Sequence, residues 1–149
     1  MVAELGSADA IMSPPRFLLD TCVILFALEG QPLHPDATSK IAESGEANAL
    51  FVSPASAWEI GKLVASKKLR LPLEPLDYFE KFATAQGISV CNLTPEIMVR
   101  SSFLPELIHR DPMDCIIIAT ARVNNYTIIT RDRLILDYGQ QGHVKTLAC

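Results

Sequence analysis

Four carboxylates in this sequence have the residue type and the spacing to carry out chemistry together: Asp20, Glu59, Asp114 and Asp132. Asp20 directly follows the apolar run 17–19, and Asp132 comes shortly after the apolar run 126–129. Asp114 lies in the first turn of a helix expected to begin at residue 112, and Glu59 lies about a turn and a half into one that begins at residue 54.

Carboxylates gathered in this way repel one another, so their proximity costs stability unless cations bind between them. Ligation by oxygen alone, without Cys or His, selects hard ions and therefore Mg²⁺ or Mn²⁺ over Zn²⁺. Such ions keep bound water and readily take phosphate oxygens as further ligands. The chemistry that follows is hydrolysis of phosphodiester bonds, with the metal activating a water molecule and stabilising charge at phosphorus.

Each acid also has an ordinary structural explanation. Asp20 could cap a helix or form a turn, and Asp114 could stabilise a helix N-terminus. Asp132 stands between two arginines and could form a solvated ion pair. Glu59, which follows a tryptophan on a mostly apolar helix, is harder to explain in this way. The hypothesis of a shared site therefore depends on all four converging at one place.

Short apolar runs alternate with helical patterns along the chain. Strands are expected at 17–19, 50–52, 88–90, 126–129 and 144–147, and helices at about 23–28, 35–41, 54–67, 75–86, from 95, 112–121 and 134–138. This alternation predicts a mostly parallel sheet covered by helices on both faces. Because ligands of such sheets bind outside the carboxyl ends of the strands, Asp20 and Asp132 should open toward that edge. The helices that carry Asp114 and Glu59 should lean over it.

Capping signals set the expected helix boundaries. The pairs Ser53–Pro54, Thr94–Pro95 and Asp111–Pro112 each place a capping side chain before a proline at the first helical position. Gly30 and Gly87 are expected to end helices. In the helix 75–86 the residues expected to be buried are Leu76, Phe79, Phe82 and Ala83. The helix before residue 111 is interpreted as an additional helical arm.

Length and composition describe one ordinary globular domain. The chain has 149 residues, 49% hydrophobic and 20% charged, and we expect a loose tail at 1–15 and one domain at 16–149. Because the net charge is −4, a nucleic-acid partner must be met by local basic groups. The four scattered cysteines form no Cys-x-x-Cys pair and indicate a reducing, cytoplasmic setting. No apolar run approaches the roughly 18 residues of a membrane helix.

The residues around these acids resemble the PIN-domain family, and more closely its VapC-like toxin ribonucleases from type II (VapBC) toxin–antitoxin systems. The matching segments, in the family's order, are Leu18–Leu28, Ser53–Ile60, Leu104–Pro105, His109–Ala121 and Ile128–Asp132. The resemblance implies an α/β/α sandwich with a central, mostly parallel sheet of about five strands and a helical arm.

Carried over by motif, the resemblance makes the same four acids both the catalytic residues and the ligands of Mg²⁺ or Mn²⁺. Thr21 and Thr130 become supporting hydroxyls, although strand-end threonines also commonly bond the backbone. Asp111 belongs to the motif, but its place before a proline suits a helix cap better than a metal ligand. Cys115 departs from the pattern, since relatives often have a basic residue there. A second departure lies at residues 67–69, where relatives more often have a turn that contains glycine.

The resemblance further implies endonucleolytic cleavage of RNA, often tRNA or rRNA, a homodimer, and a protein antitoxin that covers the acidic pocket. An arginine of the antitoxin would suit that purpose, because guanidinium pairs with clustered carboxylates. The basic residues considered for RNA contact are Arg110, Arg131, Lys62, Lys67 and Lys68. Taken one by one, these residues are better explained as ordinary solvated surface charges.

Three other classes of protein compete with this interpretation. A non-catalytic PIN-like module that binds RNA or protein should lack one or more of the acids, and all four are present. A phosphatase of the haloacid-dehalogenase type needs a second Asp two residues after the first, where Cys22 stands. A response-regulator receiver needs an Asp at the end of the third strand, where Asn92 and Leu93 stand.

Overall fold

A parallel sheet forms the centre of the fold in a computed structural model that describes residues 14–107 and 111–149. Its strands are β1 (Phe17–Leu19), β2 (Leu50–Val52), β3 (Ile88–Val90), β4 (Thr127–Thr130) and β5 (Lys145–Ala148). They lie in the order β3-β2-β1-β4-β5, and every neighbouring pair is parallel. The predicted parallel sheet of five strands is confirmed, with β1 at its middle.

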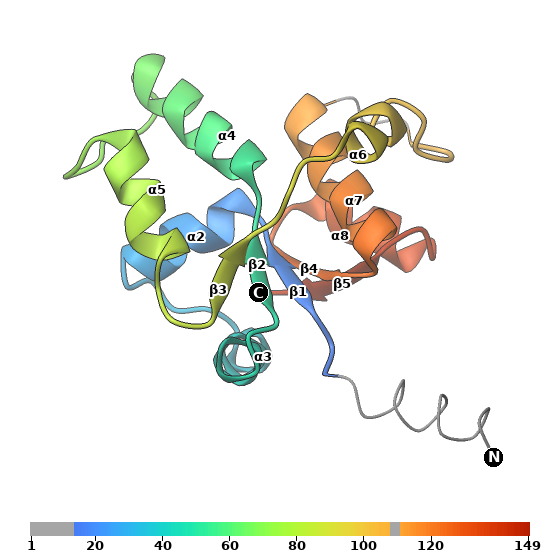
Figure 1. The fold of residues 1–149 in the computed structure, drawn as a ribbon, viewed down its shortest axis with the longest axis horizontal. Coiled ribbons are helices and arrows are strands. Elements are labelled where there is room, and N and C mark those ends of the chain that lie inside the picture. Colours follow the sequence, from blue (N-terminus) through green and yellow to red (C-terminus); the bar gives the residue numbers. More distant parts are fainter. Residues whose placement is uncertain (1–13, 108–110) are drawn as a thin grey trace.

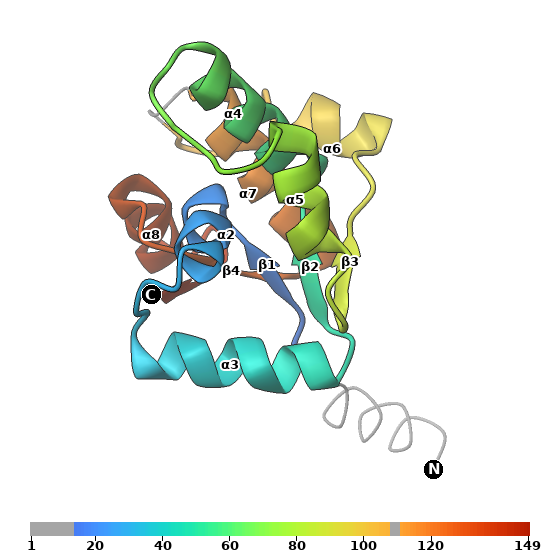
Figure 2. The ribbon, with the colours of Figure 1, turned by 90° about the vertical axis from the view of Figure 1, so that its left-hand side faces the viewer.

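Helices cover both faces of this sheet, as expected for parallel strands. They are α2 (Thr21–Leu28), α3 (Pro35–Glu46), α4 (Pro54–Ala65), α5 (Pro75–Ala83), α6 (Pro95–Arg100), α7 (Pro112–Asn124) and α8 (Arg133–Gln140). Figure 1 shows α6, α7 and α8 on one side of the strands and α2 and α5 on the other. Figure 2 shows α4 at the end where β2 terminates and α3 at the opposite end. The α/β/α fold class is therefore confirmed.

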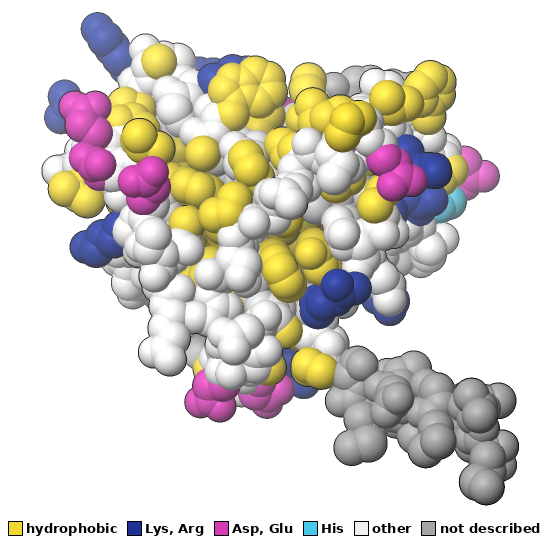
Figure 3. All heavy atoms as spheres, viewed as in Figure 1, with side chains coloured by type: hydrophobic (Ala, Val, Ile, Leu, Met, Phe, Trp, Pro, Cys, Tyr) yellow, Lys and Arg dark blue, Asp and Glu magenta, His cyan; other side chains and the backbone are white. Residues whose placement is uncertain are grey.

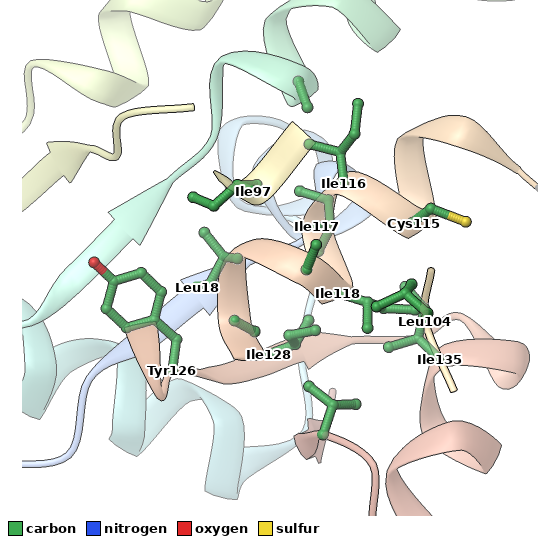
Figure 4. Packing of buried hydrophobic residues seen from close by; sticks show 14 of the residues in the cluster. Leu18, Ile97, Leu104, Cys115, Ile116, Ile117, Ile118, Tyr126, Ile128 and Ile135 are labelled. Carbon is green, nitrogen blue, oxygen red and sulfur yellow. The ribbon is translucent and has the colours of Figure 1, made fainter. Parts of the chain in front are cut away.

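The core has two halves because successive residues of a strand point to opposite faces. Leu18 and Leu19 are both fully buried, the first among residues of α6, α7 and α8 and the second among residues of α2, α3 and α5. In Figure 4, isoleucines of α7 lie over Leu18 and Ile128 of the sheet. This packing on both sides explains why the strands read as continuous apolar runs.

The predicted capping residues are confirmed. Ser53 Oγ accepts a hydrogen bond from the N–H of Ala55 at 3.0 Å, and Thr94 Oγ1 accepts one from Ile97 at 3.2 Å. Asp111 caps α7 in the same way. Each cap is followed by proline at the first helical position, so the sequence signal and the helix start coincide.

Several helices end at other residues than the sequence predicts, α3 and α5 among them. The helix α3 continues to Glu46 instead of ending near residue 41, and α5 ends at Ala83 instead of residue 86. Leu76, expected to be buried, is 63% exposed, whereas Tyr78 is 4% exposed. The reason is rotational: Tyr78 and Phe79 form the centre of the buried face, and Leu76 lies at its margin in the first turn.

Some predictions fall outside the described residues. Residues 1–13 of the predicted tail and Arg110, a candidate RNA contact, are among them. Pro14 and Pro15 are exposed and belong to no helix or strand. Within the described ranges, no helix has the length and apolar character that crossing a lipid bilayer requires.

Gly87 and Gly61 provide a matched test of this packing. Gly87 has φ +86°, and a Cβ there would lie 1.9 Å from the carbonyl oxygen of Gly45, so Gly87→Ala should lower the free energy of unfolding by more than about 1 kcal/mol. Gly61 lies inside α4, where an added Cβ would meet nothing within 4 Å, so Gly61→Ala should raise it by about 0.5–1 kcal/mol. Urea denaturation measures both, and equal stability of the two variants would contradict the close approach of α3 to β3.

Candidate active site

Asp20 stands at the carboxyl end of the middle strand with both carboxylate oxygens engaged. It is only 6% exposed. Its Oδ1 accepts a hydrogen bond from the N–H of Thr21 at 2.8 Å and thereby caps α2, while its Oδ2 accepts one from the hydroxyl of Thr130 at 2.7 Å. The orientation of this carboxylate is therefore set from two elements, α2 and β4.

Asp132 is tied to Asp20 through the same threonine. The hydroxyl oxygen of Thr130, which donates to Asp20, also accepts a hydrogen bond from the N–H of Asp132 at 2.9 Å. Asp132 Oδ1 in turn accepts from the N–H of Ile135 at 3.0 Å and caps α8. Because β1 and β4 are neighbours in the sheet, one buried hydroxyl joins the acids that follow them.

A second threonine connects Asp20 with the helix that carries Glu59. The hydroxyl groups of Thr21 and Ser56 share a hydrogen bond of 2.9 Å, and a hydrogen bond with the Thr21 side chain also lowers the pKa of Glu59. Ser56 is fully buried. Ser56 is not among the residues predicted from the sequence; its place three residues before Glu59, on the adjoining part of the same helix face, is the signal that could have identified it.

The electrostatics of these acids place them near one another. Burial raises the pKa of Asp20 above its ordinary value, the bonds from Thr130 and Thr21 oppose the rise, and Asp132 adds to it. Burial is also the largest cause of the raised pKa of Glu59. Repulsion by three further carboxylates adds to that rise: Asp20, Asp111 and Asp132. Charged groups distant in sequence thus influence one another at the carboxyl edge of the sheet.

The two acids at the start of α7 differ in what the structure shows of their roles. Asp111 Oδ1 accepts hydrogen bonds from the N–H groups of Met113 at 2.9 Å and Asp114 at 3.1 Å, so the predicted cap is present. The charge of Asp111 also raises the pKa of Glu59, and its role as a supporting residue of the site stays a prediction. Asp114 is half-buried in the first turn of α7. Its participation in the site stays a prediction.

The donor set fits a hard divalent cation in its chemistry, since it consists of carboxylate and hydroxyl oxygens. Burial, and after it the charge of neighbouring acids, raises the pKa of Asp20 and of Glu59, so their negative charge is unfavourable here and a cation would neutralise it. Within residues 14–107 and 111–149, no three Asp, Glu, His or Cys side chains are gathered closely enough to hold a metal ion. The acids are near enough to repel one another, but they are not drawn into a chelating group.

A cysteine next to the site does not extend this donor set. Cys22 Sγ lies 3.8 Å from Asp20 Oδ2. Burial, followed by the charge of Asp20, raises the pKa of the Cys22 thiol to about 12. The thiol is therefore protonated at neutral pH, and the thiolate that binds soft metals is disfavoured.

The candidate RNA-contact residue Arg131 is held against the protein. Its guanidinium donates to the carbonyl oxygen of Pro32 at 2.8 Å and lies 4.3 Å from the ring centroid of Phe26. The residue is nonetheless exposed next to Asp132. A role in binding RNA stays a prediction.

The candidate lysines lie on or just after α4. The ammonium group of Lys62 is 4.8 Å from the ring centroid of Trp58, which precedes Glu59. Lys67 follows the helix with a left-handed backbone, φ +60°, and Lys68 is exposed beside it. The unusual turn noted in the sequence is thus a left-handed residue without glycine.

Comparison with known proteins identifies similar chains. Residues 17–140 match the family described as PIN domain. The chain is 27% identical over 117 residues to Ribonuclease VapC22 of Mycobacterium tuberculosis, a match that covers 78% of this chain and 86% of that protein. Its fold is similar to a chain of DNA-bound VapBC from Salmonella typhimurium, with TM-score 0.67, 16% identity and coverage of 91% and 98% of the two chains. A chain of VapBC2 from Rickettsia felis bound to a promoter DNA fragment gives TM-score 0.65, 14% identity and coverage of 89% and 97%.

The substitution Glu59→Gln tests the electrostatic strain at the site. A carboxyl whose pKa is raised on folding binds protons more readily in the folded state, so the unfolding free energy of the wild type falls as pH rises through that range. The glutamine side chain carries no charge yet can still accept a hydrogen bond from Thr21. We expect the variant to have a higher Tm than the wild type near neutral pH and to lose this advantage as pH falls below the ordinary pKa of Glu.

Thermal unfolding at several pH values measures this difference. Glu80→Gln, on the exposed face of α5, serves as the control and should leave Tm unchanged throughout. A Glu59→Gln variant that is less stable than the wild type at neutral pH would contradict the raised pKa of Glu59.

Proposed function

The chain belongs to the PIN-domain family, and from this we propose that it is a divalent-metal-dependent endoribonuclease that serves as the toxin of a toxin–antitoxin pair. The relative from Mycobacterium tuberculosis carries the name ribonuclease. The observation that carries the proposal is the buried carboxylate of Asp20, which is coupled to Glu59 and Asp132 at the carboxyl edge of the sheet. Open α/β sheets bind their ligands at this edge.

Four carboxylates would hold Mg²⁺ or Mn²⁺ in this enzyme: Asp20, Glu59, Asp114 and Asp132. A bound cation of this kind supplies positive charge for the attacked phosphate and lowers the pKa of bound water. The protein itself fixes the relative positions of the acids. Thr130 orients Asp20 relative to Asp132, and Thr21 orients Asp20 relative to the helix that bears Glu59.

Glu59 is the acid best suited to exchange a proton during hydrolysis. Its raised pKa makes the carboxylate a stronger base than an exposed glutamate. It is half-buried, so it can reach a ligand at the edge while remaining attached to a rigid helix. Asp20, with both oxygens bonded, is better suited to hold charge than to move a proton.

We assign the remaining features of the toxin to this chain as parts of the same proposal. The substrate is RNA, with tRNA or rRNA as the class, and an antitoxin protein silences the enzyme by covering the acids. The solved neighbours named VapBC motivate the antitoxin partner. Phe103, 79% exposed, and Val99, 61% exposed, offer apolar surface for a homodimer.

A non-catalytic PIN-like module is the alternative function. Such a module would bind RNA or protein without needing carboxylates that repel one another. The raised pKa of Asp20 and of Glu59 indicates that these charged acids lower the stability of the fold. A binding module gains nothing from acids that lower its stability, so the raised pKa values favour the enzyme.

Cleavage assays test the proposed reaction. The purified chain should cut RNA in the presence of Mg²⁺ or Mn²⁺ and stop when EDTA is added. Asp20→Asn and Asp132→Asn should each lower kcat by about 100-fold or more, because each removes a charge from the metal-binding edge. Asp137→Asn, an acid of the same helix α8, is the control and should retain activity. Cleavage that persists in EDTA would overturn the mechanism.

Growth assays test the proposed biological role. Expression of the wild-type chain in a bacterial host should arrest growth, and Asp20→Asn should relieve the arrest at equal protein levels. Circular dichroism of the purified variant checks that the fold is kept. Arrest by the folded, catalytically inactive variant would show that toxicity does not come from hydrolysis of RNA.

A further inference from the structure

The tryptophan of α4 lies exposed beside the candidate active site. Trp58, the only tryptophan of the chain, immediately precedes Glu59 and is 53% exposed. With 3.6 residues per turn, Lys62 lies about 40° around the helix from Trp58 and about 60° from Glu59, between the two. The helix therefore presents an aromatic ring, an ammonium group and a site carboxylate on neighbouring strips of its surface.

Lys62 contacts the ring and not the carboxylate. Its ammonium lies 4.8 Å from the ring centroid of Trp58, although Glu59 is three residues away, at a spacing where ion pairs form. In the part of the chain that the structure describes, Lys62 and Glu59 form no ion pair within 4.0 Å. The carboxylate of Glu59 thus stays available to the acidic edge, and the indole and ammonium are presented together.

Further basic residues follow Lys62 along the chain, toward and past the end of α4. Lys62, Lys67, Lys68 and Arg70 are all exposed, and no acidic residue stands between the first and the last of them; we call these four residues the basic strip. The end of α4 at Ala65 is about 9 Å along the helix axis from Glu59. Figure 3 shows dark blue side chains projecting at the upper left, over the end of α4 in Figure 1.

We propose that Trp58 and Lys62 form a stacking platform for an unpaired nucleotide of the RNA next to the bond that is cut, and that the basic strip holds the phosphates beyond it. This inference rests on the proposed ribonuclease function. A protein with net charge −4 needs such local cations to hold a polyanion. Aromatic rings flanked by cations bind single-stranded nucleic acid through base stacking, which the paired bases of a duplex cannot supply.

Because Trp58 is the only tryptophan, its fluorescence reports on the platform directly. In buffer without divalent metal, titration of the full chain with a short single-stranded oligoribonucleotide should quench the emission to saturation. Two control molecules should quench the emission much less. One is an abasic ribose-phosphate chain of equal length, and the other is the same oligoribonucleotide annealed to its complementary strand. Equal quenching by the abasic chain would overturn stacking and leave only electrostatic attraction.

Variants separate the platform from the catalytic acids. Trp58→Ala should weaken binding of fluorescein-labelled oligoribonucleotide about tenfold and raise KM by a similar factor with kcat nearly unchanged, while Trp58→Phe should retain most of the affinity. Lys62→Gln should weaken binding and reduce its dependence on salt. The matched controls are Leu76→Ala, at an exposed apolar residue of α5, and Lys145→Ala, at an exposed lysine of β5.

The outcomes distinguish this inference from the proposed function. Metal-dependent cleavage with unchanged KM in Trp58→Ala would defeat the platform and leave the ribonuclease intact. Base-dependent quenching without any cleavage would support the platform as a binding site and defeat the enzyme. A Trp58→Ala variant that alters the sedimentation of the protein but not its affinity for RNA would assign the exposed indole to a protein interface and overturn the proposal.

Discussion

The arrangement of this site depends on helix N-termini that hold like charges at one edge of the sheet. Asp20 caps α2, Asp111 caps α7 and Asp132 caps α8, each accepting hydrogen bonds from backbone N–H groups. The positive end of a helix dipole stabilises a carboxylate, and a cap contributes about 1 kcal/mol to stability. The same residues that start the helices are therefore the ones that gather negative charge. Capping offsets part of the repulsion that their proximity creates.

This arrangement changes how the alternative explanations of each acid should be weighed. The sequence offered a helix cap at Asp20 and a solvated ion pair at Asp132 as alternatives to a functional site. In the structure both acids cap helices, and a capping carboxylate can also belong to a shared site. The oxygen that caps a helix fixes the side chain, and the Thr130 hydroxyl between the two acids fixes their relation. Leu18 and Leu19 anchor the strand beneath them in both halves of the core. Rigid support of this kind positions charged groups more accurately than a loop can.

Those parts of the fold that follow from local chemistry could be predicted from the sequence. Runs such as 17–19 predicted buried strands, and cap-proline pairs such as Ser53–Pro54 predicted helix starts, because both signals act within a few residues. The exposure of Leu76 could not be predicted in this way, since it depends on the rotation of α5 against its neighbours. The contact of Ser56 could not be predicted either, because its partner Thr21 is distant in sequence and because serine is common on helices without a functional role.

The distribution of charge along α4 resolves an apparent conflict in a protein that is acidic and is proposed to act on RNA. Acids at the carboxyl edge repel phosphate until a cation neutralises them, so they cannot provide initial affinity. The basic strip can, because it begins beside Glu59 and continues past the end of the helix. At physiological salt, screening limits exposed charges to about 8 Å, so a cation must be close to the site to act on the bound strand. Lys62 satisfies this condition by its place on the helix, and its contact with Trp58 keeps it from cancelling the glutamate that the reaction would need.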